Sequence, residues 1–292
     1  MADGLAINVA KLNFYFCIEL FTAIRPIAMI NHSFAVMAYN DSPYLSACLD
    51  SIKAQTLDST IYITTSTPSE YIENISKKYG VELFITEKGL GIAHDWNFSL
   101  QQAKTKYVTL AHQDDLYMKA YTESCIRASE KHKDTLICFT GYNEVINDTK
   151  RSRTLLLDVK RLMLKTSMPF KNNIHGKIRK NLLLMVGCPI AAPSVMYNLE
   201  HLKDFEFSPE FSINMDWDAW CRLAGMEGRF VYVKKELLSH RIHPDSATTE
   251  GLKNNIRQHE DLKIFKRFWP DFLANQLAKV YARSYKSNIH KV

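Results

Sequence analysis

YVTLAHQDDLYM, residues 107–118, is an apolar run that stops abruptly on polar side chains. The apolar part is too short for a useful helix and predicts a buried strand. Two adjacent acids, Asp114 and Asp115, follow its end. Adjacent carboxylates repel each other and are costly to bury, so a divalent cation bound between them is one interpretation. A solvated turn is the other interpretation of an isolated pair of acids.

The segments before this run alternate between strand and helix patterns. Gly80 closes one helix, and Pro43 suits the first turn of another. The expected order is strand 33–38, helix 43–52, strand 60–65, helix 70–79, strand 81–85 and helix 92–103. Such strict alternation predicts an α/β fold with a doubly wound, parallel sheet and with ligands at the carboxyl ends of its strands.

Elements of both kinds are also predicted after Asp115. They are a helix near 117–131, strands near 136–140 and 192–197, a helix over 211–223, short strands at 230–233 and 236–243, and a helical tail over 251–285 that is broken at Pro270. His240 and His243 stand three residues apart, so in a regular strand they point to opposite faces. At most one of them is therefore expected to bind a given metal ion.

Composition and missing motifs narrow the function. The chain has 292 residues, 46% of them hydrophobic and 23% charged, which is typical of a soluble globular protein. Its six cysteines are scattered without a CxxC pair, so we expect a reducing, cytoplasmic location and no structural zinc. No Gly-x-Gly-x-x-Gly, P-loop or Gly-x-Ser-x-Gly motif occurs. The usual dinucleotide-binding, NTPase and α/β-hydrolase classes are therefore excluded.

Residues 1–30 form an unusual N-terminal extension. From residue 5 to residue 30 the chain is apolar and aromatic, but Lys11, Glu19 and Arg25 interrupt it, so no uncharged run is long enough to span a bilayer. No small-residue cleavage site follows a basic start, which argues against a secretory signal. Two interpretations stay open: an amphipathic surface helix, or a natural start at Met29 with a poorly packed extension before it.

Residues 150–180 form a strongly basic segment. Ten Lys and Arg residues stand there with one acid, Asp158, and leucines and methionines are interleaved with them. Such a segment can lie on an anionic membrane surface or bind a phosphate-bearing acceptor. A solvated helical face over the core is the alternative. Nucleic acid is not an expected partner, because the aromatic side chains of a single-strand binder are missing.

Several short motifs together resemble the family-2 glycosyltransferases of the GT-A fold, in particular those of bacterial surface-polysaccharide synthesis. In the family's order they are Ala38-Tyr39-Asn40, Gly91 with Asn97, His112-Gln113-Asp114-Asp115, Asp216 and Asp218 with Arg222, and Arg241-Ile242-His243-Pro244 with Ser246. The resemblance implies a GT-A domain over residues 31–248, with a nucleotide-sugar half (31–140) and an acceptor half (141–248). The extension 1–30 precedes this domain, and a C-terminal helical tail, 249–292, follows it.

The same resemblance implies roles for individual side chains. Asp216 is the expected general base. The expected metal ligands are Asp114, Asp115 and His243, on an Mn²⁺ or Mg²⁺ ion. Hydroxyls of Thr65 and Ser66 stand where the family usually has an acidic pair, and His112 stands where it usually has an Asp. The full set implied to bind the nucleotide-sugar is Tyr39, Asn40, Thr65, Ser66, Asn97, His112, Gln113 and Asp114.

The chemistry of sugar transfer independently favours a glycosyltransferase. A cation held by carboxylates neutralises a nucleoside diphosphate leaving group, and one carboxylate can deprotonate the acceptor hydroxyl, which predicts inversion at the anomeric carbon. The expected partners are a nucleotide-sugar donor, a saccharide or lipid-linked saccharide acceptor, and the inner face of the plasma membrane. Two alternatives stay open. One is a metal-dependent phosphohydrolase or nucleotidyltransferase that uses His112, Asp114, Asp115 and His243, and the other is a non-catalytic membrane-surface binder.

Overall fold

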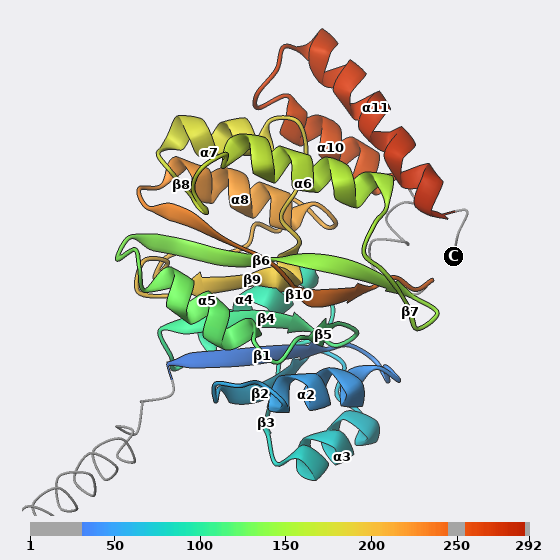
Figure 1. Cartoon of the computed structure of the whole chain (residues 1–292). Coiled ribbons are helices and arrows are strands. Elements are labelled where there is room, and N and C mark those ends of the chain that lie inside the picture. Colours follow the sequence, from blue (N-terminus) through green and yellow to red (C-terminus); the bar gives the residue numbers. More distant parts are fainter. Residues whose placement is uncertain (1–30, 245–254, 290–292) are drawn as a thin grey trace, which may run out of the picture. The chain divides into compact units, whose positions relative to one another are not determined.

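The structure is a computed structural model that describes residues 31–244 and 255–289 (Figure 1). The expected N-terminal extension, Ser246 and the first part of the C-terminal tail lie outside the described residues. The described residues from His32 onward form one compact unit. Among the described helices, none is long and apolar enough to cross a membrane.

The first half of the unit has the predicted alternation of strands and helices. In chain order its elements are β1 (His32–Ala38), α2 (Leu45–Lys53), β2 (Thr60–Thr65), α3 (Glu70–Tyr79), β3 (Glu82–Ile85), α4 (Ile92–Gln101) and β4 (Tyr107–His112). The four strands are parallel in the order β3-β2-β1-β4, so their carboxyl ends share one edge of the sheet. This edge is where the predicted site residues of β1, β2 and β4 meet.

The second half completes a mixed, mostly parallel sheet. Strand β9 (Val195–Asn198) lies antiparallel between β4 and β6 (Thr135–Ile146), and β10 (Arg229–Arg241) lies parallel to β6. The short strand β5 (Leu116–Tyr117) pairs antiparallel with β10. It takes residues that were expected to begin a helix, and α5 (Tyr121–Ser129) therefore starts later than predicted.

The two short strands expected at 230–233 and 236–243 are one strand, β10, and this expectation is corrected. Its pairing with β6 shifts register between Val233 and Glu236. Gly141 lies opposite this irregularity, and a Cβ on Gly141 would come within 3.0 Å of the Lys235 carbonyl oxygen. The bulge interrupts the alternation of side chains along the strand, so one strand reads as two in the sequence.

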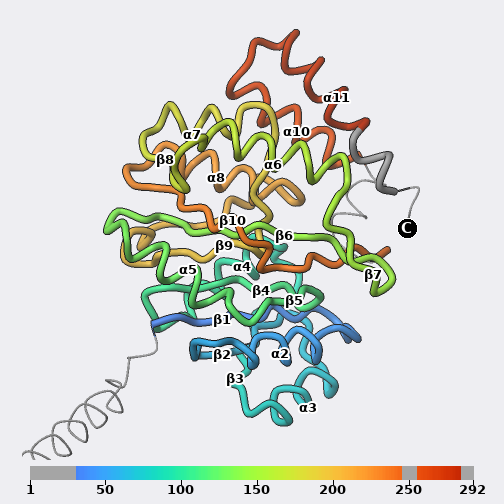
Figure 2. Tube along the Cα trace, viewed as in Figure 1, coloured from blue at the N-terminus to red at the C-terminus, as the bar shows by residue number. Residues whose placement is uncertain are grey.

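Helices cover the sheet unevenly (Figures 1 and 2). Toward the β3 edge lie α2 and α3. On the β6 side lie α6 (Leu155–Ser167), α7 (Lys177–Leu184), α8 (Met215–Gly225), α10 (Ile256–Phe265) and α11 (Asp271–Ile289). The C-terminal helices pack directly on α8, because the Trp217 ring lies 5.1 Å from the Phe265 ring and 5.6 Å from the Tyr281 ring.

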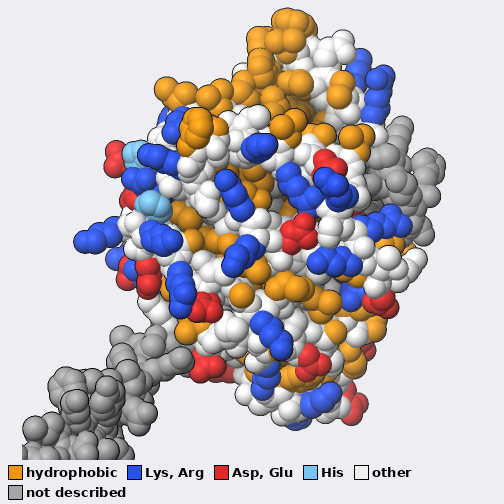
Figure 3. Space-filling model, in the orientation of Figure 1, with side chains coloured by type: hydrophobic (Ala, Val, Ile, Leu, Met, Phe, Trp, Pro, Cys, Tyr) orange, Lys and Arg blue, Asp and Glu red, His pale blue; other side chains and the backbone are white. Residues whose placement is uncertain are grey.

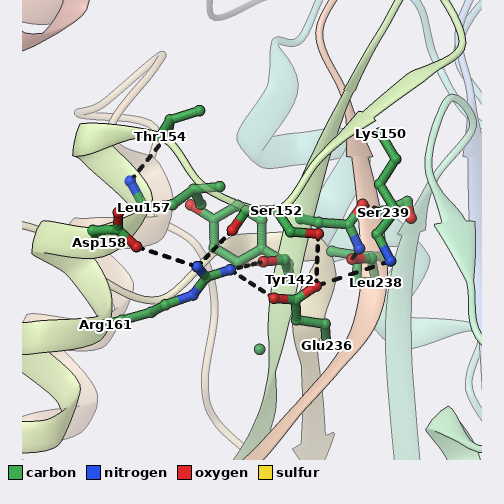
Figure 4. Close-up of polar contacts among 12 residues, drawn as sticks. Tyr142, Lys150, Ser152, Thr154, Leu157, Asp158, Arg161, Glu236, Leu238 and Ser239 are labelled. Atoms are coloured by element: carbon green, nitrogen blue, oxygen red, sulfur yellow. Dashed lines mark hydrogen bonds and ion pairs between the residues drawn. The ribbon is translucent and has the colours of Figure 1, made fainter.

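Several basic side chains of residues 150–180 point into the molecule. Arg161 on α6 donates to the Glu236 carboxylate of β10 at 2.8 Å, and Lys150 Nζ lies 3.9 Å from the same carboxylate (Figure 4). Lys160 donates to the Tyr142 hydroxyl of β6 at 2.9 Å. Lys160 and Arg161 therefore anchor α6 to the sheet, so these two side chains do not belong to the basic surface that is one interpretation of this segment.

Lys180 provides a test of how α8 is held. Its fully buried ammonium donates to the carbonyls of Leu223, Met226 and Gly228 at the end of α8, at 3.3, 2.6 and 3.2 Å. Burial lowers the pKa of Lys180 to about 8, so the group is still protonated at pH 7. Lys180→Met leaves buried carbonyls without a donor and should lower the free energy of unfolding at pH 7 by about 2 kcal/mol.

Chemical denaturation of Lys180→Met would measure this loss. Lys177→Met, an exposed position on the same helix, is the matched control and should change the free energy of unfolding by less than about 0.5 kcal/mol. Equal effects of the two substitutions would contradict the capping role.

Candidate active site

A cleft opens at the carboxyl ends of β1 and β2. Its volume is about 670 Å³, and its lining is mostly polar side chains, which are Asn40, Asp41, Ser66, Thr67, Pro68, Ser69, Thr86 and Lys88. Two of the residues predicted to bind a nucleotide, Asn40 and Ser66, belong to this lining. A cleft of this size accommodates a nucleoside-sized group.

The loop after β1 is held by contacts with β2 and with the loop after β4. The Gln113 side chain pairs with the Tyr39 backbone, accepting from its N–H at 3.0 Å and donating to its carbonyl at 2.9 Å. Asn40 has a φ of 52° and donates its N–H to the Thr67 hydroxyl at 2.7 Å. The Thr65 hydroxyl in turn accepts the Thr67 N–H at 3.0 Å. These bonds leave the Tyr39 ring exposed beside the cleft.

A carboxylate does reach the end of β2, although no acid stands in β2 itself. Ser66 donates its hydroxyl to Asp95 on α4 at 2.8 Å. Burial raises the pKa of Asp95, and the bond from Ser66 acts against this rise. Because the proton of Ser66 is committed to Asp95, the hydroxyl oxygen can accept a bond from a ligand in the cleft. Sequence reasoning assigned no role to Asp95, because only the tertiary packing of α4 brings it to Ser66.

The two acids after β4 have different surroundings. Asp115 is 0% exposed and accepts the Arg241 N–H at 2.8 Å and a bond from His240 Nδ1 at 3.0 Å. Asp114 is half-buried, and His243 Nε2 lies 2.7 Å from its Oδ2. The assumption of one regular strand through both histidines is corrected: β10 ends at Arg241, and each imidazole reaches one carboxylate.

Contacts between these acids and histidines shift the pKa values of His240 and Asp114. Burial alone would lower the pKa of His240, but the Asp115 carboxylate outweighs it and raises this pKa to about 9. For Asp114, burial acts to raise the pKa, but the bond from His243 and the nearby charge of His112 act against it, and the net pKa is lowered. An ionised Asp114 carboxylate is ready to receive a cation.

His112 completes a set that fits a divalent cation. One ligand atom each from His112, Asp114 and Asp115 lie within 4.8 Å of one another. Nε2 of His112 is buried and has no hydrogen-bond partner among the residues that the structure describes. An imidazole nitrogen and carboxylate oxygens are suitable ligands for Mn²⁺. The resemblance implied a nucleotide contact for His112 and a metal contact for His243, but the structure places His112 in this cluster.

Asp216 lies in the first turn of α8 and is half-buried. Its Oδ1 accepts the Trp217 N–H at 2.7 Å. Burial raises the pKa of Asp216, and the charges of Arg257, Lys160 and His112 act in the opposite direction without cancelling it. A carboxylate with a raised pKa is a suitable general base near neutral pH.

Asp218, two residues further on, has a structural role. Its side chain is 1% exposed and forms ion pairs with Arg222 at 2.9 Å and with Arg267, two residues after the end of α10, at 2.7 Å. Both oxygens are therefore engaged, one in a contact within α8 and the other in a contact that holds α8 to the segment after α10. Of the two acids in this turn, only Asp216 has the partly exposed carboxylate that a reaction needs.

The start of α8 is clamped by a side chain from another helix. Glu260 of α10 accepts the N–H groups of Ser212, Ile213 and Asn214 at 2.6, 2.9 and 2.7 Å. A carboxylate at this position also favours the positive end of the helix dipole. Sequence reasoning missed Glu260, because an isolated Glu in a helical tail carries no signal of a contact with α8.

Asn97, which the resemblance placed among the nucleotide-binding residues, is engaged elsewhere. Its amide donates to the Phe207 carbonyl at 2.9 Å and accepts the Phe207 N–H at 2.7 Å. Both functional groups of the side chain are thus used to fasten α4 to the segment that leads into α8.

The sequence of the chain is similar to those of known proteins. Residues 33–198 match the family described as glycosyl transferase family 2. An uncharacterized glycosyltransferase of Rickettsia felis is 22% identical over 253 residues, which are 82% of this chain and 38% of that protein. An uncharacterized glycosyltransferase of Methanocaldococcus jannaschii is 22% identical over 244 residues, which are 78% of this chain and 77% of that protein.

Solved structures share the fold. Staphylococcus aureus TarS 1–349 in complex with UDP-GlcNAc has a TM-score of 0.60 at 15% identity, over 85% of this chain and 70% of that one. The mannosyltransferase PcManGT from Pyrobaculum calidifontis, in complex with GDP-Man and Mn²⁺, also has a TM-score of 0.60, at 14% identity over 95% of this chain and 78% of that one. The predicted GT-A architecture is confirmed by this likeness.

Proposed function

Because the chain belongs to glycosyl transferase family 2, we propose that it transfers a sugar from a nucleotide-diphosphate sugar to an acceptor hydroxyl, with inversion at the anomeric carbon. The observation that carries the proposal is the position of His112. His112 lies close enough to Asp114 and to Asp216 to act on both electrostatically, so the acidic pair after β4 and the carboxylate of α8 lie around one site. Donor activation and acceptor deprotonation can therefore take place side by side.

The donor binds at the carboxyl ends of β1, β2 and β4. The cleft takes the nucleoside, the exposed Tyr39 ring stacks on the base, and the Ser66 hydroxyl accepts a bond from the ligand. Asp114 and His112 would hold Mn²⁺ or Mg²⁺, which supplies neutralisation of the charge that develops on the leaving diphosphate. Asp115, which is held in place by its bond from the Arg241 N–H, would help to position the metal ion.

Asp216 removes the proton of the acceptor hydroxyl as its oxygen attacks the anomeric carbon from the side opposite the diphosphate. A single displacement with a single base inverts the configuration at that carbon. Asp218, the only other acid in this turn of α8, is engaged with two arginines and is not free to act as a nucleophile. This arrangement favours a one-step transfer over a two-step one.

The environment of Lys160 indicates the chemistry of the acceptor. Its ammonium is half-buried near Asp216, donates to the Tyr142 hydroxyl and forms no ion pair with a described carboxylate. A half-buried cation is stabilised when an anionic group of the substrate lies beside it. A saccharide joined to a lipid through phosphate, as an intermediate of bacterial surface-polysaccharide synthesis, offers such a group next to its hydroxyls.

The decisive experiment is calorimetric titration of the protein with UDP, GDP, CDP and dTDP, each with and without Mn²⁺. We expect one nucleotide to bind and its affinity to depend on the metal. Absence of binding across the panel would refute the proposal and favour a non-catalytic surface protein. Metal-dependent release of phosphate from a phosphate ester, without binding of any nucleotide, would instead favour a phosphohydrolase at the same cluster.

A further inference from the structure

Helices α6 and α7 carry an apolar surface that faces solvent. Three of its large side chains, Leu155, Phe170 and Ile178, are 84%, 95% and 77% exposed. We name this surface the α6–α7 face, and its apolar members are Leu155, Val159, Leu162, Phe170, Ile178 and Leu182. In Figure 3 hydrophobic side chains gather along the upper edge of the molecule, where Figure 1 places α7 and α11.

The exposed residues repeat with helical spacing. On α6, Leu155, Val159 and Leu162 follow one another at intervals of four and three residues and form one stripe. Leu157 and Leu164 are buried on the other side of the same helix. A surface helix normally has one apolar side, which packs on the core. The second apolar side of α6 therefore indicates a second binding partner.

The charges around this face are almost all positive and lack acidic partners. The segment from residue 152 to residue 186 contains a single acid, Asp158, and that carboxylate already lies 3.4 Å from Arg161. Five exposed cations on α6, on α7 and in the segments beside them have no ion pair to a described carboxylate, and they are Arg153, Lys165, Lys171, Lys177 and Arg179. An apolar surface on helices that also carry unpaired cations is complementary to an anionic lipid surface.

We propose that the α6–α7 face docks on the anionic surface of a lipid bilayer. The apolar side chains enter the boundary between headgroups and acyl chains, and the cations contact the phosphates. A second copy of the chain is a poorer partner, because the same five cations on each copy would then face one another.

Docking at this face would bring the membrane next to the site. The side of α6 opposite the exposed stripe carries Lys160, which bonds Tyr142. The Tyr142 ring lies 6.4 Å from that of His240, which contacts Asp115. Binding to the bilayer does not depend on the proposed function, but the benefit for a lipid-linked acceptor rests on it.

The test is co-flotation of the purified full chain with vesicles of phosphatidylcholine alone and of phosphatidylcholine with 30% phosphatidylglycerol, without nucleotide. We expect binding to the anionic vesicles only. Lys165→Gln, Lys171→Gln and Lys177→Gln combined should weaken it roughly 100-fold, since each cation near the surface contributes about fivefold. Leu155→Ser, Leu162→Ser and Ile178→Ser combined should weaken it at least tenfold.

Matched controls are Lys77→Gln with Lys78→Gln on α3, and Ile85→Ser with Leu90→Ser beside β3, which remove exposed side chains of the same kinds elsewhere. Equal loss in variants and controls, or no binding by the unaltered chain, would overturn the proposal. A dimer that the apolar variant abolishes would place a second copy on the face. A lower melting temperature of that variant, with vesicle binding intact, would place another part of this chain there. Calorimetry with nucleotides reports separately on the active site.

Discussion

Asp216→Asn should lower kcat by about 10³-fold while the affinity for the donor nucleotide stays the same. The substitution keeps the size of the side chain and its bond to the Trp217 N–H, but an amide cannot take a proton from the acceptor hydroxyl. Initial rates at saturating donor and acceptor, together with calorimetric titration of the nucleotide, would separate the two effects. An unchanged kcat would remove Asp216 from the reaction.

The matched control on the same helix is Asp218→Asn. Removal of this buried carboxylate leaves Arg222 and Arg267 without their partner, and it should lower the free energy of unfolding by about 2 kcal/mol, since both arginines are partly screened by solvent. The two substitutions should therefore differ in kind: one reduces turnover in a stable protein, and the other reduces stability. Loss of turnover in a fully folded Asp218→Asn protein would contradict this division.

The raised pKa of Asp216 also predicts the pH dependence. The base acts when deprotonated, so kcat/KM should rise with pH through a value above 3.8, the ordinary value for an aspartate. A carboxyl whose pKa is higher in the folded protein destabilises the fold once it ionises. Asp216→Asn should therefore be at least as stable as the unaltered protein at pH 7, and it should lose the acid limb of the rate profile.

Local signals in the sequence are sufficient to predict where many helices and strands begin and end. β2 and α3 begin and end where they were predicted, because a β-branched run forms the strand and because Ser69 and Gly80 mark the helix ends. Ser69 caps α3 by accepting the Ile72 N–H at 3.3 Å, and Gly80 adopts the left-handed conformation at its end. Such contacts lie within a few residues of one another, so a sequence pattern can report them.

The parts of the site that were missed depend on distant pairing. Asp95 reaches Ser66 only through the packing of α4, and Glu260 reaches the start of α8 from a helix 46 to 48 residues further along the chain. Lys160 and Lys165 look alike in a basic segment, but Lys160 donates to the Tyr142 hydroxyl and Lys165 is exposed to solvent. A sequence pattern lists the charges, whereas their direction is set by the tertiary fold.

Asp114→Asn should weaken metal-dependent nucleotide binding on the order of 10²-fold. Asp114 is the half-buried acid of the pair, whereas Asp115 is fully buried and already engaged with His240 and the Arg241 N–H. An amide carries no charge to hold the cation near the diphosphate. Calorimetric titration of the nucleotide with and without Mn²⁺ would measure the loss.

Asp115→Asn distinguishes a metal ligand from a residue that positions one. It removes the carboxylate that pairs with the charged His240, so the melting temperature should fall even in the absence of metal. Asp114→Asn should lower the melting temperature less than Asp115→Asn does without metal, because the Asp114 carboxylate that bonds His243 is partly solvated. If Asp115→Asn instead kept its stability and lost the metal dependence while Asp114→Asn retained it, the fully buried acid would be the direct ligand and Asp114 the supporting one.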